Sequence, residues 1–312
     1  MPLIYRDEYN IRLYGIQKLH PFDSEKYAKV YSYLREKTGL GSDTFQVPEE
    51  ISEADLRLVH NRAYLDSLKR SEVIAQIAEL GLLRILPASV LDRKILKPMR
   101  YAVGGTVRGA DLALHKGWAV NLSGGYHHAK AGEGSGFCFY ADIPVAVKKL
   151  WRERPGLRVL IIDLDAHQGN GTAAVFGDDK RIFILDVYNR DAYPRDGAAR
   201  VYIDYDYPLP AETPDKLYLK TVRRAVPAAM EACKPQLVIY NSGTDILDGD
   251  RLGGMRVSAG GIVQRDELVF REALKRKIPI LMVLSGGYTR RSGHITGQSL
   301  ENILRNVLKM PH

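Results

Sequence analysis

The sequence predicts a single domain of the α/β class, in which a parallel sheet has helices on both faces. Two observations support this prediction. Short apolar runs rich in β-branched residues alternate with amphipathic helical segments, and a polar cluster directly follows each later run. The 312 residues, 45% of them hydrophobic, are enough for one large core. The chain has no internal repeat and no long Pro/Gly/Ser-rich linker, so we expect one domain over residues 1–312.

Five apolar runs have the length of buried strands. They are Trp118 to Leu122, Arg158 to Leu164, Arg181 to Val187, Gln236 to Tyr240 and Pro279 to Leu284. A further short strand is expected near Leu3. The region from there to about His115 is expected to be mostly helical, with one helix starting at Ser52.

Helical patterns separate the later strands and follow the last one. The first covers Asp142 to Arg154, and the last carries Leu300, Ile303, Leu304, Val307 and Leu308 on one face. A second helix is expected from Thr213 to about Cys233, with Thr213 as N-cap and Pro214 at the first helical position. A third is expected over Ser258 to Arg276.

Composition limits the classes of partner. The net charge is +8, from 45 Lys and Arg against 37 Asp and Glu, but the basic residues are scattered, so we expect no nucleic-acid partner. Two cysteines, Cys138 and Cys233, are too few for a disulfide framework or a thiolate zinc site. No stretch has the length of a membrane span, and the N-terminus has no signal-peptide pattern. We therefore expect a soluble, cytoplasmic protein, whose oligomeric state the sequence does not predict.

Polar clusters follow the five strands at their carboxyl ends. They are Ser123 to His128, Asp163 to Asn170, Asp186 to Asn189, Asn241 to Asp250 and Ser285 to Tyr288. In a parallel sheet these ends lie along one edge, which is where ligands bind. The convergence predicts a functional site at that edge.

A metal site is expected within these clusters. Asp165 and His167 are two residues apart, so in an extended segment they share a face and can reach one ion. Asp245 arrives from another strand end as a third ligand, while Asp163 lies one step deeper. Two carboxylates and one imidazole suit zinc, and three protein ligands leave a position open for water and substrate. The alternative for the segment alone is a solvated loop.

Two adjacent histidines, His127 and His128, follow two glycines at another strand end. Facing a metal, they are expected to transfer protons, and the alternative is that they bind the metal themselves. Tyr288 follows the last strand, where its hydroxyl could donate to an oxyanion. Taken alone, Tyr288 is better explained as a structural tyrosine, because the chain has 18 tyrosines.

Taken together, these segments resemble the histone deacetylase family, and its class IV branch most closely. The segments are GGYHHA (124–129), GSGFCFYAD (134–142), IIDLDAHQGNG (161–171), ILDVYNRDAYP (184–194), YNSGTDILDGDRLGG (240–254) and LSGGY (284–288), with HPFDSEKY (20–27) before them. The resemblance covers nearly the whole chain in order. It implies a three-layer α/β/α domain with a mostly parallel sheet of about eight strands. It also implies hydrolysis of N-ε-acyl-lysine amides in a protein or peptide substrate.

The resemblance implies roles for individual residues. Zinc would be held by Asp165, His167 and Asp245, and Tyr288 would polarise the substrate carbonyl. A narrow tunnel for the acyl-lysine stem would be lined by Gly125, Phe137, Tyr193 and Leu252. A potassium ion would be held by Asp163, Asp165, His167, Asp186 and Val187.

The same resemblance makes His127 and His128 the tandem catalytic pair. Asp163 would stand behind His127 and Asn170 behind His128, where class I members have a second aspartate. A carboxylate favours the imidazolium form, whereas a neutral amide does not. We therefore expect His127 to stay protonated, and His128 to take a proton from the attacking water and pass it to the leaving lysine amine.

Three other readings of the site remain open at this point. A dinuclear hydrolase of the arginase type would need further bridging carboxylates around Asp165 and Asp245. An acetylpolyamine or other small-molecule deacetylase would use the same zinc site. A binding module would hold acyl-lysine without cleaving it. Within the deacylase prediction, the preferred acyl chain length, acetyl or long-chain, depends on how Tyr14 to Phe22 packs.

Overall fold

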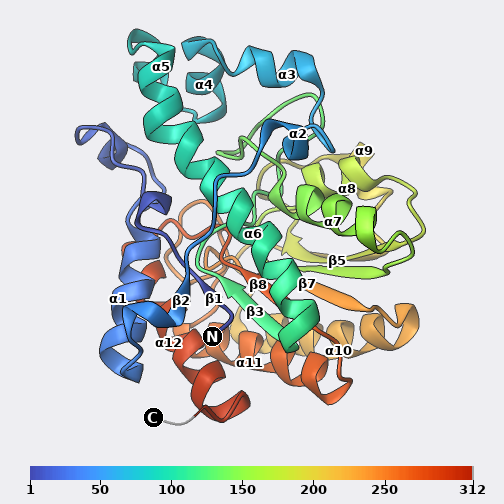
Figure 1. Ribbon diagram of the computed structural model, residues 1–312. Coiled ribbons are helices and arrows are strands. Elements are labelled where there is room, and N and C mark those ends of the chain that lie inside the picture. The colour runs from blue at the N-terminus through green and yellow to red at the C-terminus, as the bar shows by residue number, and fades with distance from the viewer. Residues whose placement is uncertain (311–312) are drawn as a thin grey trace.

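The computed structural model describes residues 1–310, which contain one sheet of eight strands in the order β2-β1-β3-β8-β7-β4-β5-β6 (Figure 1). Every neighbouring pair is parallel. The strands are β1 (Leu3–Ile4), β2 (Phe45–Gln46), β3 (Trp118–Asn121), β4 (Val159–Asp163), β5 (Ile182–Asn189), β6 (Tyr205–Leu209), β7 (Leu237–Asn241) and β8 (Ile280–Val283). The predicted α/β class and the sheet of about eight strands are confirmed.

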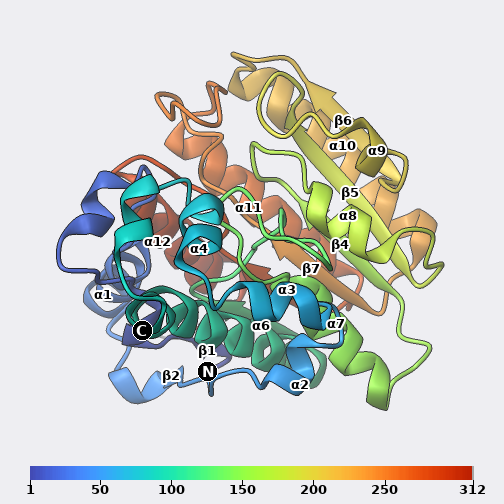
Figure 2. The same ribbon diagram turned by 90° about the horizontal axis from the view of Figure 1, so that it is seen from above.

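Helices cover both faces of this sheet (Figure 2). They are α1 (Lys26–Thr38), α2 (Glu53–Leu56), α3 (Arg62–Ser67), α4 (Ser71–Ile77), α5 (Ala88–Leu91), α6 (Lys97–Lys116), α7 (Asp142–Glu153), α8 (Asn170–Phe176), α9 (Gly197–Arg200), α10 (Asp215–Cys233), α11 (Ala259–Lys275) and α12 (Ser292–Asn302). One face carries α6, α7 and α8, and the other carries α10, α11 and α12, with α1 packed on α12. The result is the predicted three-layer arrangement.

Strand β4 shows how the two layers are held. Its residues are all buried, and they alternate between two hydrophobic clusters. Leu160 and Ile162 join the cluster on the α10–α12 side, whereas Val159 and Ile161 join the cluster on the α6–α8 side. Parallel strands covered on both faces are expected to be apolar, as this one is from Val159 to Ile162, before it ends at Asp163.

Strand β5 and the edge strands differ from the prediction. β5 ends at Asn189 rather than Val187, because it continues to pair with β6 as far as Asn189 opposite Leu209. The cluster Asp186 to Asn189 therefore belongs to the strand instead of following it. β2 and β6 were not predicted. β2 has two residues, and β6 is partly exposed and contains Pro208, as edge strands allow.

The helix starts were predicted with mixed success. Ser258 and Ser52 are N-caps, with side chains that accept hydrogen bonds from the backbone N–H groups of Gly261 and Asp55. The predicted start at Thr213 is wrong by one residue. Pro214 is extended and precedes α10, which begins at Asp215, and the Thr213 hydroxyl donates to the Pro210 carbonyl instead of capping the helix.

No helix within residues 1–310 is both long enough and apolar enough to cross a membrane.

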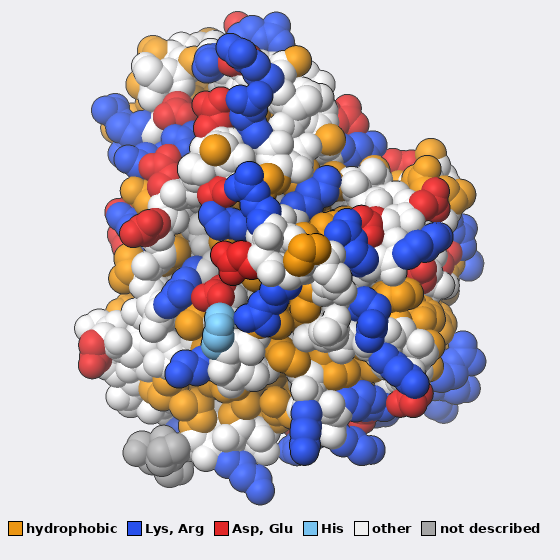
Figure 3. Space-filling view, turned by 45° about the vertical axis from the view of Figure 1, so that its right-hand side comes forward, with side chains coloured by type: hydrophobic (Ala, Val, Ile, Leu, Met, Phe, Trp, Pro, Cys, Tyr) orange, Lys and Arg blue, Asp and Glu red, His pale blue; other side chains and the backbone are white. Residues whose placement is uncertain are grey.

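On the face drawn in Figure 3, Lys and Arg side chains are interspersed with acidic and apolar ones. That distribution agrees with the scattered charge in the sequence. The absence of a nucleic-acid partner stays a prediction.

Candidate active site

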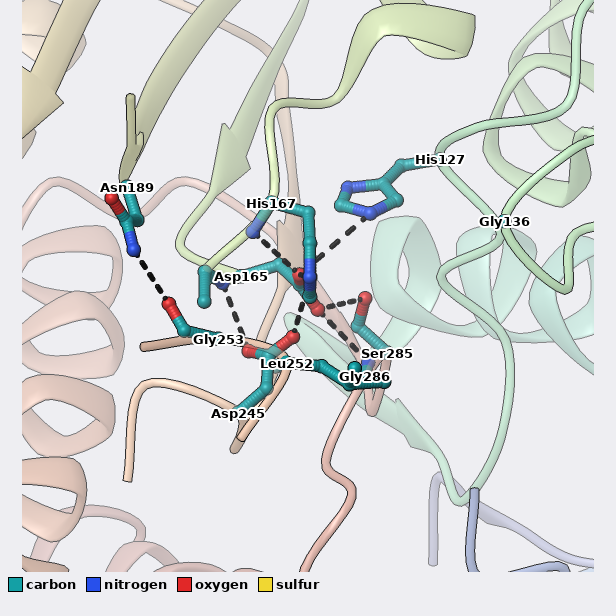
Figure 4. Close-up of polar contacts among 12 residues, drawn as sticks. His127, Gly136, Asp165, His167, Asn189, Asp245, Leu252, Gly253, Ser285 and Gly286 are labelled. Carbon is teal, nitrogen blue, oxygen red and sulfur yellow. Dashed lines mark hydrogen bonds and ion pairs between the residues drawn. The ribbon is translucent and has the colours of Figure 1, made fainter. Parts of the chain in front are cut away.

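The polar clusters meet at the carboxyl edge of the sheet. Asp165 and His167 follow β4, Asp245 follows β7, Ser285 follows β8, and His127 lies in the segment after β3. Figure 4 shows these side chains directed toward one another from their separate strand ends. The strand-end rule therefore predicted correctly that these clusters meet at one edge of the sheet.

Asp165, His167 and Asp245 form a compact buried group. The Nδ1 atom of His167 lies 3.0 Å from Asp165 Oδ1 and 2.9 Å from Asp245 Oδ2. One ligand atom from each residue lies within 4.8 Å of the other two. Among residues 1–310, the ion-pair partners of both carboxylates are imidazoles, those of His127 and His167. Two buried carboxylates without a Lys or Arg partner need positive charge, and the donor set fits a divalent ion such as zinc.

The segment after β8 fixes the orientation of the Asp165 carboxylate. The Ser285 hydroxyl donates to Asp165 Oδ2 at 2.8 Å, and the Gly286 N–H donates to the same oxygen at 2.9 Å. A Cβ atom on Gly286 would come within 2.5 Å of Asp245 Oδ2, so a glycine is required there. Hydrogen bonds of this kind orient metal ligands, and their loss typically lowers metal affinity or activity.

The two histidines lie side by side but have different partners. Both are buried, and their ring centroids are 4.1 Å apart. His127 Nδ1 is 2.8 Å from Asp163 Oδ2, whereas His128 Nδ1 is 2.8 Å from Asn170 Oδ1. The structure thus brings together each pair that the sequence predicted.

These partners separate the two pKa values. Burial alone would lower the pKa of His127, but the Asp163 and Asp165 carboxylates outweigh it and raise the pKa to about 9. Burial holds the pKa of His128 well below its usual value, and the neighbouring His127 and His167 lower it further. The directions of the two pKa shifts agree with a charged His127 and a neutral His128.

Tyr288 lies beside the metal-ligand group. Its ring centroid is 5.9 Å from that of His167 and 5.9 Å from that of Phe137. Burial raises its pKa well above the usual value, and Asp165 and Asp245 raise it further, so the hydroxyl keeps its proton. The Tyr288 N–H donates to Asp250 Oδ2 at 2.7 Å. Asp250 thus anchors the backbone of the tyrosine.

The four predicted tunnel residues occupy two kinds of position. Gly125 and Phe137 line the same pocket as His127, His128 and Tyr288.

The other two lie outside that lining. Tyr193 is 45% exposed and Leu252 is 39% exposed. The Tyr193 ring contacts His128, with centroids 5.0 Å apart. The role of these residues in a tunnel stays a prediction.

The predicted potassium ligands other than Asp165 and His167 lie within strands β4 and β5 at the same edge. Asp163 and Asp186 are register partners in β4 and β5, and both are buried. The Asp186 Oδ2 atom accepts a hydrogen bond from the Gly169 N–H, but its buried Oδ1 atom has no hydrogen-bond partner among the described residues. Val187 follows in β5. A buried carboxylate oxygen without a donor fits a bound cation.

Sequence reasoning missed two buried cations that hold the catalytic segments. Lys26 is fully buried, and its ammonium group donates to three backbone carbonyls after β8. They belong to Leu284 (3.0 Å), Ser285 (3.0 Å) and Gly286 (2.6 Å). These partners lie 258 to 260 residues away in sequence, so no local pattern indicates them.

Arg265 is the second of these cations. It is fully buried in α11 and pairs with Asp266 at 2.7 Å. It also donates to the carbonyls of Leu164 at 3.0 Å and Gly243 at 2.6 Å, each close to a residue of the metal-ligand group. Lys26 and Arg265 together connect the segments that carry Asp165, Asp245 and Tyr288.

The fold and the site together define an α/β protein with a buried Asp-His-Asp group at the carboxyl edge of a parallel sheet. The family model described as "Histone deacetylase domain" matches residues 20–305, and the chain belongs to the histone deacetylase family. The predicted family is confirmed.

Similar proteins agree with this assignment. The chain is 44% identical over 306 residues to "Histone deacetylase 2" of Arabidopsis thaliana, covering 98% of this chain and 79% of that protein. It is 30% identical over 260 residues to "Acetoin utilization protein AcuC" of Bacillus subtilis, covering 78% and 65%. Among solved structures, the HD domain of HDA15 superposes with a TM-score of 0.77 over 97% of this chain and 88% of that one. At 20% identity the last similarity supports the fold alone.

Proposed function

We propose that this protein is a zinc-dependent hydrolase of N-ε-acyl-lysine amides, which releases lysine and a carboxylate. One observation carries the proposal. The buried group of Asp165, His167 and Asp245 lies at the same edge as two histidines with opposite pKa shifts. Membership of the histone deacetylase family supports an acylated lysine as the substrate.

Asp165, His167 and Asp245 are the residues that would hold zinc. When bound there, zinc polarises the scissile carbonyl and makes water a stronger acid. The ring of His128 is neutral, and its Nε2 atom accepts a proton as water attacks the carbonyl carbon. Asp163 stabilises the positive charge of His127. That positive charge in turn stabilises the negative charge that develops as water attacks the carbonyl.

Tyr288 completes the set of catalytic groups. Its protonated hydroxyl donates to the oxyanion that forms from the substrate carbonyl. His128 then passes its proton to the lysine nitrogen as the C–N bond breaks, and the acid is released as a carboxylate. The second proton of water leaves the carboxylic acid and ends on the released amine, so the products are a carboxylate and a lysine ammonium group.

We further propose that the acyl group can extend beyond acetyl. An apolar cavity adjoins the catalytic pocket and shares Phe22, Met99 and Phe137 with it. The rest of its lining is Ile11, Leu13, Gln17, His20, Ser24, Ala78, Leu80, Leu83, Ile95 and Phe139. The volume of this cavity is about 70 Å³. An acyl chain that passes Phe137 and Met99 would lie against this apolar lining.

We assign the chain to the class IV branch of the family. Support comes from Asn170 behind His128, where class I members have an aspartate. The segment 20–27 also resembles that branch, and it supplies Phe22 to the cavity and Lys26 to the loop after β8. A single catalytic domain over residues 1–312 and a cytoplasmic location stay predictions, which limited proteolysis and cell fractionation test.

We also propose a potassium ion held by Asp163, Asp165, His167, Asp186 and Val187. The buried Oδ1 atom of Asp186, which has no hydrogen-bond partner within residues 1–310, supports it. Because a ligand that binds only the folded state raises stability, the melting temperature should rise with potassium concentration at constant ionic strength. An equal rise in sodium or tetramethylammonium chloride would contradict a potassium site.

The experiment that tests the main proposal compares matched acetyl-lysine and myristoyl-lysine peptides, and an acetylpolyamine, with and without a zinc chelator. We expect chelator-sensitive release of lysine from the peptides and faster turnover of the myristoyl peptide. Faster acetyl release would restrict the enzyme to short acyl groups. Turnover of the polyamine alone would favour a small-molecule deacetylase, and no turnover of any substrate would contradict the proposal.

The two histidines are tested by His127→Ala and His128→Ala in single-turnover assays. A missing general base typically costs about 10² to 10⁴ in rate. We expect the larger loss, together with loss of the acidic limb of the pH–rate profile, in His128→Ala. Equal residual rates and equal pH profiles would contradict the division of roles.

A further inference from the structure

Asp196 lies one hydrogen bond beyond the second catalytic histidine. His128 Nδ1 is 2.8 Å from Asn170 Oδ1, and Asn170 Nδ2 donates to Asp196 Oδ2 at 3.2 Å. A carboxylate therefore lies behind His128, with the Asn170 amide between the two groups. Asn170 is 3% exposed, so its amide has no alternative partner in bulk water.

The carboxylate of Asp196 is held in place from several sides. Its Oδ1 atom accepts the N–H groups of Ala198 and Ala199 at 3.1 and 3.0 Å, at the start of α9. Lys130 Nζ lies 3.3 Å from its Oδ2 atom. These partners lower the pKa of Asp196, the Ala199 N–H and the Asn170 amide most, so the group is an anion at neutral pH.

The backbone of Asp196 is fixed just as closely. Gln168, next to the metal-ligand residue His167, accepts the Asp196 N–H at 2.9 Å and donates to the Asp196 carbonyl at 3.0 Å. Gln168 is 2% exposed. This reciprocal pair ties the segment that follows β5 to the segment that carries the metal ligand.

The hydrogen bonds from Asp196 through Asn170 to His128 allow only one arrangement of protons. An ionised carboxylate only accepts, so Asn170 must direct its NH₂ group toward Asp196 and its oxygen toward His128. The opposite amide orientation would place two acceptors 3.2 Å apart. An amide oxygen also only accepts, so His128 must carry its proton on Nδ1. The Nε2 atom then keeps its lone pair, which is the state that a general base requires.

We propose that Asp196 is a positioning residue, which acts through the Asn170 amide to hold His128 in the Nδ1-protonated tautomer. The inference rests on the proposed function in that it gives His128 the role of base. It assigns no contact between Asp196 and substrate. Where a carboxylate contacts the histidine directly, that carboxylate sets the tautomer. Here the negative charge of Asp196 lies one residue farther from His128, behind the Asn170 amide.

The test uses Asp196→Ser in the full-length, zinc-loaded protein. Serine can still accept N–H groups at the start of α9 but is too short to reach Asn170. We expect a kcat about tenfold lower with KM within about twofold, as for other residues that orient catalytic groups. Glu133→Gln is the matched control, because it removes a carboxylate that is 3.2 Å from the same Lys130 and does not touch Asn170.

The second measurement is the tautomer of His128, by ¹⁵N NMR of histidine-labelled protein, assigned with His128→Gln. We expect Nδ1–H alone in the wild type and in Glu133→Gln, and a mixture in Asp196→Ser. Asp196→Asn, which turns an NH₂ group toward Asn170 while its oxygen keeps the cap, should favour the Nε2–H form.

Unchanged tautomer and unchanged kcat in Asp196→Ser would overturn the proposal. A fall in melting temperature with the tautomer unchanged would also overturn it, since Asp196 would then act only as a helix cap. The NMR result does not depend on turnover. If no acyl-lysine peptide is cleaved by the wild type, the proposed function fails while the NMR measurement still decides the role of Asp196.

Discussion

The catalytic site and the cavity beside it are bounded by two walls, one polar and one apolar, that are built in different ways. The polar wall consists of Asp165, His167, Asp245, His127 and His128, which extend from strand ends, and each has hydrogen-bond partners at defined distances. The apolar wall consists of Phe22, Leu83, Ile95, Met99 and Phe137, from segments that surround the adjoining cavity. Hydrogen bonds and metal ligation are directional, whereas apolar contact is not. A change in the polar wall should therefore stop the chemistry, and a change in the apolar wall should alter only which acyl group fits.

The largest effect is expected at Asp245. Asp245→Ala removes one of three predicted metal ligands, and the loss of several kcal/mol of charge stabilisation corresponds to a fall in kcat of about 10³ or more. Metal content per chain and peptide hydrolysis measure the two consequences. The control is Asp248→Ala, because Asp248 is an exposed aspartate in the same segment. Full activity in Asp245→Ala would mean that the group holds no catalytic metal, and retained biological activity without hydrolysis would favour a binding module.

A smaller effect is expected at Tyr288. Tyr288→Phe removes only the hydroxyl and keeps the ring contacts with Phe137 and His167 and the backbone bond to Asp250. Loss of one oxyanion donor typically costs about 10² to 10³ in kcat. We expect that loss with little change in KM. The control is Tyr126→Phe, which changes another buried tyrosine. Equal rates in the two variants would contradict an oxyanion role for Tyr288.

Lys26 joins the two walls, because it starts α1 and holds the carbonyls after β8. Lys26→Met keeps the stem but removes the donor from the carbonyls of Leu284 and Ser285, whereas that of Gly286 still accepts from Thr244. Each unsatisfied buried group costs about 1 to 3 kcal/mol. We expect the free energy of unfolding to fall by about 2 to 4 kcal/mol in urea titrations.

Activity should also fall in Lys26→Met, because Tyr288 lies on the segment that Lys26 holds. The matched control is Lys29→Met, in the next turn of α1, where the ammonium group is partly exposed and pairs with Asp23. An exposed pair of this kind contributes little to stability. If both variants unfold at the same urea concentration, the buried lysine does not stabilise the loop.

The two walls also differ in how far the sequence predicts them. The polar wall follows from local patterns: Asp165 and His167 are two residues apart, and each polar cluster lies at the carboxyl end of an apolar run. The rule that parallel strands end at one edge then places Asp245 beside them. The edge strands β2 and β6 were missed because short, partly exposed strands carry too few apolar residues for a pattern.

The apolar wall and the buried cations could not be predicted for a different reason. Phe22, Leu83 and Met99 meet across more than one helical segment, and nothing in the local sequence of each indicates the others. Arg265 reaches Leu164 over 101 residues, and Asn170 reaches Asp196 over 26. A resemblance supplied the residue behind His128, but only the packed structure shows what lies behind that residue.

The smallest and most selective effect is expected at Met99, which lines both the catalytic pocket and the adjoining cavity. Met99→Trp places an indole in the passage between them, so an acyl chain that needs the cavity loses contact while acetyl does not. We expect kcat/KM for a myristoyl-lysine peptide to fall by about tenfold or more, with the acetyl-lysine value within about twofold. Leu82→Trp adds the same ring at a position that is 43% exposed and outside the lining, and should change neither value. Equal losses for both peptides would show that residue 99 affects the polar wall, and equal retention would show that the acyl chain leaves the pocket by another route.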